Sequence, residues 1–326
     1  MVFIHNKNIW PAYIPPQKDE LFSSWLCRLS AEHQVKVYTF LKIYFKNSSS
    51  FLARNIDLLK PSEIIDGIIN HALLDKQQID NLFLTSYEGI IFEKANCQTY
   101  TTGLLPLGIF NQKRINFGTL YCSSCLSKPI PYFKKQWRLS ISLVCLECNV
   151  RLKEKCDNCK RPVMYHLTNQ SINTSDVIYP LSLKYCQCGY DLSKTNTKDM
   201  LPTMIEIEYQ KFINQTIKDG YNNISSFSFL FFEGFIMLIT KYLSSAKNNP
   251  FREKLLLHYA KETIPCKKKD FGLWPIDSRR LAITDVFPLF ENYPYTLDEF
   301  LNKNKISKSY IRNDNNYPYW LLKLFP

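Results

Sequence analysis

Tyr121-Cys122-Ser123-Ser124-Cys125 opens a run of eight cysteines, which continues with Cys145-Leu146-Glu147-Cys148, Cys156-Asp157-Asn158-Cys159 and Cys186-Gln187-Cys188-Gly189. Two thiolates this close together on a tight turn can direct both sulfurs at one metal ion, which lies about 2.3 Å from each. The pattern therefore predicts four half-sites. We expect Cys122, Cys125, Cys145 and Cys148 to bind one zinc ion, and Cys156, Cys159, Cys186 and Cys188 to bind a second.

The spacing of these pairs favours zinc over disulfide bonds, which are the alternative for closely spaced cysteines. About 20 residues separate the first pair from the second, which is typical of a zinc ribbon. The third and fourth pairs stand further apart, which indicates an inserted loop. A site with four sulfur ligands has no position open for water, so we expect both zinc ions to be structural.

Composition indicates a chain with more than one folded domain. Its 326 residues are 45% hydrophobic, so two or three domains are expected. High aromatic content, 14%, with only nine glycines favours helices with aromatic cores. The longest apolar stretch, 227–243, is shorter than the roughly 20 residues that a membrane span needs, and 1–12 lacks the apolar core of a secretory signal. We therefore expect no membrane association and a cytoplasmic protein, whose thiols stay reduced.

The predicted fold is mostly α, with small zinc-ribbon β modules. Helices are expected over about 19–33, capped by Asp19, over 37–45 and 62–73, and after a capping box formed by Asp75 and Gln78. Residues 137–144 give the one clear strand signal between the first two cysteine pairs. We predict an extended arm (1–16), an N-terminal helix-turn-helix-like domain and connector (17–120), tandem zinc-binding modules (121–192) and a C-terminal helical domain (200–326).

The C-terminal domain is expected to contain helices over about 203–218, 227–243 and 250–263. Two short helices near 297–302 and 306–312 resemble a second helix-turn-helix. In that arrangement Ser309 and Arg312 would face a DNA groove. A plain helical hairpin with a surface arginine is the alternative.

The formal net charge of +12 falls only to about +8 when eight thiolates and two zinc(II) ions are counted. Residues 113–161 hold eleven Lys and Arg but three acids. Such an excess indicates a polyanionic partner, nucleic acid above all, although it could also be a cationic shell that offsets the zinc–thiolate centres. The candidate nucleic-acid contacts are Lys134, Lys135, Arg138, Arg151, Lys153, Lys160, Arg161, Ser309 and Arg312.

Known catalytic patterns are not found in the sequence. Gly103 and Gly108 have the spacing of a phosphate loop, but Ile109 and Phe110 stand where Lys and Ser or Thr are required. His-Glu-x-x-His, Gly-x-Ser-x-Gly and the deaminase signature are absent, and the five histidines are scattered. The three remaining cysteines, Cys27, Cys97 and Cys266, are expected to be single buried thiols. We therefore expect a protein that is not an enzyme.

Two sets of motifs together resemble the TniQ family, which includes TnsD-type proteins. The stretch from Pro15 to Arg28, with Asp19-Glu20-Leu21 and Ser24-Trp25-Leu26, is similar to the family's opening motif P-x-x-x-E-x-x-x-S-W-x-x-R. Its cysteine core is matched by Tyr121 to Leu126, Trp137-Arg138-Leu139, Cys145-x-x-Cys148, Leu152 and Cys156-x-x-Cys159. The resemblance covers about residues 11–190.

The resemblance implies a target-selection adaptor in DNA transposition, which recruits a TnsC-like AAA+ ATPase. Target DNA and, as in some relatives, an RNA-guided CRISPR effector with its guide RNA are further implied partners, and a homodimer is an option. This chain departs from the family in having Cys148 where a histidine is common and in its Cys186-x-Cys188 half-site, so a distorted site should be the second one. It is also shorter than TnsD proteins and is expected to lack their sequence-specific reader. The alternatives are a zinc-ribbon and helix-turn-helix transcription regulator and a zinc nuclease or deaminase.

Overall fold

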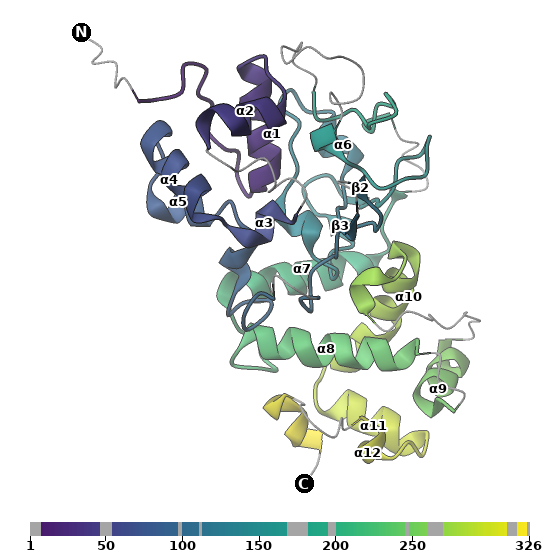
Figure 1. Cartoon of the computed structure of the whole chain (residues 1–326). Coiled ribbons are helices and arrows are strands. Elements are labelled where there is room, and N and C mark those ends of the chain that lie inside the picture. The colour runs from purple at the N-terminus through teal and green to yellow at the C-terminus, as the bar shows by residue number, and fades with distance from the viewer. Residues whose placement is uncertain are drawn as a thin grey trace. The chain divides into compact units, whose positions relative to one another are not determined.

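A computed structural model describes residues 8–45, 54–96, 100–110, 113–167, 182–194, 200–244, 248–259, 270–311 and 318–324. It is mostly helical, as predicted (Figure 1). The α-helices are α1 (Phe22–Glu32), α2 (Val37–Tyr44), α3 (Ile56–Leu59), α4 (Ser62–His71), α5 (Lys76–Asp80), α6 (Ser123–Leu126), α7 (Met204–Asp219), α8 (Ser228–Tyr242), α9 (Pro250–Tyr259), α10 (Ile276–Val286), α11 (Tyr295–Lys303) and α12 (Lys308–Ile311).

The remaining regular elements are short. The 3-10 helices are η2 (Leu84–Tyr87), η3 (Lys135–Arg138), η4 (Tyr165–Leu167), η6 (Phe271–Leu273), η7 (Phe287–Phe290) and η8 (Tyr319–Leu324). The described strands form two antiparallel pairs, β1 (Ile109–Phe110) with β2 (Lys113–Arg114), and β3 (Val144–Cys145) with β4 (Val150–Arg151). No helix among the described residues has both the length and the apolar character needed to cross a membrane.

The chain divides into two compact units. The first consists of Met1–Ser86, Leu107–Leu139 and Leu152–Met200, and the second of Tyr87–Pro106, Ser140–Arg151 and Leu201–Pro326. Each unit is therefore assembled from separate stretches of sequence. The predicted boundaries between arm, helical domain, zinc modules and C-terminal domain stay a prediction, and so does the helix-turn-helix character of the N-terminal part.

The core of the first unit begins at the end of the N-terminal arm. Trp10 is 2% exposed, and its ring centroid lies within 6.1 Å of those of Trp25, Phe40, Tyr44 and Phe45. These side chains come from α1, from α2 and from the residue that follows α2. Burying such large aromatic surfaces gives much of the packing free energy of a core. The arm is thus fixed to α1 and α2 by an aromatic cluster.

The start of α1 differs from the prediction. The helix begins at Phe22 and has no side-chain cap, so the expected Asp19 cap is wrong. Asp19 has a positive φ of 57°, and its carbonyl accepts a hydrogen bond from the Lys135 backbone N–H at 2.8 Å. The residue therefore turns the chain three residues before the first residue of the helix. The capping box of Asp75 and Gln78 at α5 is confirmed.

The strand expected over residues 137–144 is also wrong. This stretch begins inside η3, and extended pairing is confined to the two-residue strands β3 and β4. Residues 137–145 are all buried, so alternation of apolar and polar residues here does not separate a buried face from an exposed one. The backbone N–H groups of Leu143 and Val144 donate to the side chain of Gln210, at 2.8 and 3.1 Å, and not to a neighbouring strand.

The second unit is built around α8, which packs against α9, α10 and η8 (Figure 1). Gly234 permits the contact with η8, because a Cβ atom there would lie 2.4 Å from the ring of Trp320. Helix α7 begins with a capping box of Thr203 and Glu206 and ends at Gly220, whose φ of 77° suits glycine. The helices predicted near 203–218 and 227–243 are confirmed. The end of the one predicted over 250–263 lies outside the described residues.

Candidate metal centres

The second cysteine cluster has the geometry that a tetrahedral metal ion requires. The sulfurs of Cys156, Cys159, Cys186 and Cys188 all lie within 4.8 Å of one another. Two Sγ···Sγ distances are 3.7 Å, between Cys156 and Cys188, and 3.8 Å, between Cys159 and Cys186. Two bonds of about 2.3 Å at a tetrahedral angle separate their sulfurs by about 3.8 Å. The four thiols are free rather than bonded in disulfides, and they fit a metal ion.

The backbone of each pair explains why both sulfurs point the same way. A residue with positive φ directly follows three of the four half-sites: Asn149 at 51°, Lys160 at 58° and Gly189 at 82°. The chain reverses at these residues, and the Cys186 backbone N–H donates to the Tyr190 carbonyl at 2.8 Å. The Cys186-x-Cys188 pair makes this turn with one residue fewer, and its sulfurs still join the cluster. The distortion expected at the second site is not needed to bring its four sulfurs together.

Burial and hydrogen bonding shift the pKa values of two thiols in this cluster in opposite directions. Burial raises the pKa of the Cys186 thiol above its usual value. Burial also opposes ionisation of Cys188, but the Tyr190 backbone and the Asn158 side chain outweigh it and lower the pKa of that thiol to about 7. One ligand is thus poised to lose its proton near neutral pH. A metal cation favours the thiolate form of the others.

The first cluster consists of Cys122, Cys125, Cys145 and Cys148, whose sulfurs also lie within 4.8 Å of one another. Helix α6 forms the first half-site, where the Cys122 sulfur accepts the Cys125 backbone N–H at 3.3 Å. The β3–β4 hairpin forms the second half-site. Both predicted groups of four cysteines are therefore brought together, and each could hold a metal ion. Cys27 is a buried single thiol, as expected, whereas Cys97 and Cys266 lie outside the described residues.

The predicted nucleic-acid contacts fall into separate environments. Lys134, Lys135 and Arg138 are 7%, 6% and 0% exposed. Arg138 lies 3.3 Å from the Asp57 carboxylate, and Lys135 donates to the Ser86 hydroxyl at 2.8 Å. Burial lowers the pKa of Arg138 to about 10, against the effect of Asp57, so its guanidinium stays charged at neutral pH. These three cations lie in the core of the first unit and are not on a surface that DNA reaches.

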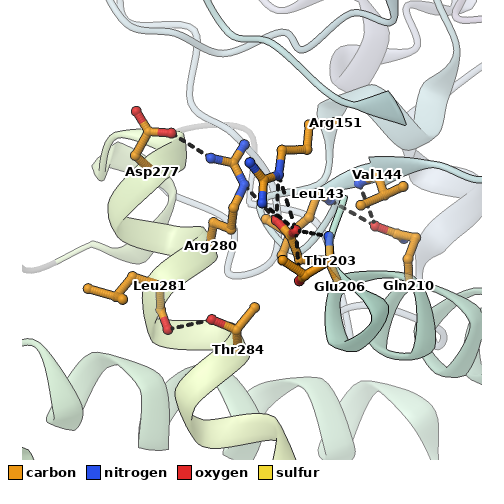
Figure 2. Close-up of polar contacts among 10 residues, drawn as sticks. All are labelled: Leu143, Val144, Arg151, Thr203, Glu206, Gln210, Asp277, Arg280, Leu281 and Thr284. Carbon is orange, nitrogen blue, oxygen red and sulfur yellow. Dashed lines mark hydrogen bonds and ion pairs between the residues drawn. The ribbon is translucent and has the colours of Figure 1, made fainter. Parts of the chain in front are cut away.

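The other candidates lie nearer to solvent. Arg151 is held by Glu206 within the second unit (Figure 2), and Lys153 pairs with Asp157. Lys160 and Arg161 are exposed beside the second cluster. Ser309 is part of α12, and Arg312 lies outside the described residues.

The opening motif folds the arm against α1. Glu20, 1% exposed, accepts hydrogen bonds from the Ser24 hydroxyl at 2.8 Å and from Arg28 Nε at 3.0 Å. Arg28 also donates to the Pro15 carbonyl at 3.1 Å, and Trp25 Nε1 donates to the Ile14 carbonyl at 2.9 Å. The motif residues therefore hold the extended chain before α1 in place.

A buried polar group beside this motif was missed by the sequence reasoning. Asp57, 1% exposed, accepts the Ser23 backbone N–H at 2.7 Å and the Ser23 hydroxyl at 3.0 Å, and the Tyr165 hydroxyl lies 2.5 Å from that of Ser23. No spacing rule connects positions so distant in sequence. The only available signal was their polarity within otherwise apolar stretches.

Comparison with known proteins bears on the part of the chain just described. The sequence model of the TniQ family matches residues 11–152. No curated protein sequence matches the chain. The match includes the end of the arm (11–16), the opening motif and the whole first cluster, whereas the resemblance from 153 to 190 stays a prediction. The match covers less than half of the chain, and over residues 11–152 the chain is similar to the TniQ family.

Proposed function

We propose that this protein is a non-enzymatic adaptor of DNA transposition, which selects the target site and recruits a TnsC-like AAA+ ATPase. The observation that carries the proposal is the TniQ match over residues 11–152. The opening motif supports it, because Glu20, Trp25 and Arg28 keep the arm in a fixed conformation. A fixed arm and aromatic core offer a rigid surface to a partner protein.

We further propose that both clusters bind zinc and that the zinc is structural. Sites of four thiolates suit zinc, which prefers tetrahedral sulfur coordination. With four protein ligands, no coordination position remains for water or substrate. Cys125→Ser and Cys159→Ser should each lower the zinc content from two ions to one and unfold the affected module, because metal binding and folding are coupled. Full zinc content in either variant, measured by elemental analysis, would contradict the assignment.

Direct DNA contact is proposed through the exposed cations next to the second cluster. Neutralising Lys160 and Arg161 to Gln should reduce the slope of log affinity against log salt by about 1.8, since each phosphate contact contributes roughly 0.9. Lys211→Gln with Lys218→Gln is the matched control, because both lysines are exposed on α7. Fluorescence anisotropy with duplex DNA measures the slope. An unchanged slope, or an equal loss in the control, would exclude this surface.

The recruitment step is tested by expressing this protein together with the genes that neighbour its own and identifying the proteins that co-purify with it when ATP is present. Trp25→Ala should abolish co-purification, because it releases the arm from α1, whereas the exposed substitution Tyr221→Ala should not. If no ATPase co-purified with this protein, that result would contradict the adaptor role and favour a free-standing DNA-binding regulator. A CRISPR effector or a second copy of the chain would be seen in the same experiment.

A further inference from the structure

The hairpin that carries Cys145 and Cys148 is held by side chains from the helix that follows the second cluster. Gln210 of α7 is fully buried, and its Oε1 accepts the backbone N–H groups of Leu143 and Val144 at 2.8 and 3.1 Å (Figure 2). These are the two residues directly before Cys145. One amide oxygen thus fixes the chain where it enters the half-site.

A second residue of α7, one helical turn before Gln210, fixes the chain where it leaves the half-site. Glu206, 1% exposed, accepts from Arg151 Nε at 3.0 and 3.1 Å and from Arg151 Nη2 at 2.7 Å. Arg151 ends β4, three residues after Cys148. A bidentate guanidinium–carboxylate pair of this kind fixes the orientation of the two side chains as well as the distance between them. Entry and exit of the half-site are therefore both tied to α7.

Two further side chains hold the segment before the hairpin. The Tyr209 hydroxyl of α7 donates to the Ile141 carbonyl at 2.9 Å, and Arg279 of α10 donates to the Ser140 carbonyl at 2.7 Å. Tyr209 and Arg279 are both fully buried. Residues 140–143 are thus anchored by side chains rather than by a neighbouring strand.

The charged side chains around Glu206 neutralise one another. Arg280 Nε lies 2.9 Å from the Glu206 carboxylate, and Arg280 Nη1 lies 2.5 Å from Asp277. Burial opposes ionisation of Glu206, but hydrogen bonds from Arg151 and Thr203 outweigh it, so the pKa of the carboxyl lies below its usual value. Two guanidiniums and two carboxylates leave no excess charge for a phosphate. Arg151 therefore holds the β3–β4 hairpin in place and is not available to bind a phosphate.

We propose that α7 and α10 are functional parts of the first metal centre and position its Cys145–Cys148 half-site. The inference rests on the proposal that this cluster binds zinc. Groups behind the ligands hold them in binding geometry, and their loss typically costs 10–100-fold in metal affinity. The first centre thus depends on residues beyond 200, outside the TniQ match. By linkage, zinc at this centre stabilises α7 and α10 in return.

The test measures zinc release to a chelator from the full chain, with Cys159→Ser used to assign the faster and slower phases to the two clusters. Gln210→Leu removes the acceptor and should speed release from the first cluster roughly 10–100-fold, leaving the second unchanged. Gln210→Glu keeps an acceptor oxygen and should retain near wild-type release. Gln215→Leu, on the exposed face of α7, should also match the wild type.

A milder variant keeps the test decisive if Gln210→Leu does not fold. Tyr209→Phe deletes one hydroxyl and should speed the same phase several-fold, with faster hydrogen exchange in residues 141–151 and unchanged exchange in α8. Unchanged release, or equal acceleration from both clusters, would overturn the inference while the zinc proposal stands. A wild-type chain without zinc would overturn both.

Discussion

The buried ion pair of Asp57 and Arg138 gives the sharpest test of whether Arg138 serves the core or binds DNA. Their closest atoms are 3.3 Å apart, and the two side chains are 1% and 0% exposed. Asp57→Asn removes the negative charge and keeps the shape of the side chain. Arg138 is then left with a positive charge in a site that water does not reach.

The expected cost follows from that isolation. Removing one partner of a buried pair destabilises by about 3–5 kcal/mol. For a unit of this size, 1 kcal/mol shifts the melting temperature by roughly 2–4 °C, so a fall of roughly 6–20 °C is expected. Arg138→Met should cost less, because Ser23 still donates two hydrogen bonds to Asp57. Asp57→Asn with Arg138→Met removes both charges and should recover much of the loss.

Thermal unfolding of the four zinc-loaded proteins, followed by circular dichroism, measures these shifts as a double-mutant cycle. DNA affinity is measured on each protein well below its melting temperature. The reasoning would be refuted if Arg138→Met melted like the wild type and lost DNA affinity, since that is the behaviour of a surface cation. Equal and additive losses in the two single variants would show that the charges do not interact.

Three other perturbations test separate parts of the fold. Burial holds the pKa of His166 well below its usual value. Below about pH 6.5 the unfolded state therefore binds a proton at this histidine that the folded state does not bind. The free energy of unfolding should fall as the pH is lowered through this range, by up to about 1.4 kcal/mol per pH unit. Urea denaturation should show this slope in exposed His258→Gln and not in His166→Gln; equal slopes would exclude His166. Trp10→Ala should cost about 3–5 kcal/mol and expose the arm to protease, and an arm that resists cleavage would contradict its role. Gly234→Ala places a Cβ atom 2.4 Å from Trp320 and should cost about 1–3 kcal/mol in thermal unfolding, whereas an unchanged melting temperature would show that η8 can move away.

The metal ligands could be predicted from the sequence because their geometry is local. Two cysteines within four residues can share a metal only through a tight turn, so the spacing of Cys156 and Cys159 already describes half a site. The capping box of Asp75 and Gln78 was predictable for the same reason. Both depend on interactions between residues three or four positions apart.

The missed features depend on contacts between distant positions. Gln210 lies 67 residues from Leu143, to which it is hydrogen-bonded, and nothing in either neighbourhood indicates the other. Residues 137–144 suggested a strand because apolar and polar side chains alternate there. That signal assumes that polar side chains face water, whereas Ser140 and Ser142 are buried. Arg138 was placed among the DNA contacts through the same assumption.

The basic excess of residues 113–161 is therefore not one continuous surface. Arg114, Lys134, Lys135 and Arg138 are buried, and Arg151 and Lys153 are paired with acids. Lys128 is exposed three residues after Cys125 of the first cluster, and the side chain of Lys113 lies outside the described residues. The exposed cations of this stretch around the second cluster are Lys155, Lys160 and Arg161. Four thiolates and one divalent ion carry a charge of −2, so the three cations leave a net charge of about +1 there. Three phosphate contacts correspond to a salt slope of only about −2.7. Under the proposed function, DNA contact at this module is weak and salt-sensitive, and most of the affinity for a target site has to come from protein partners.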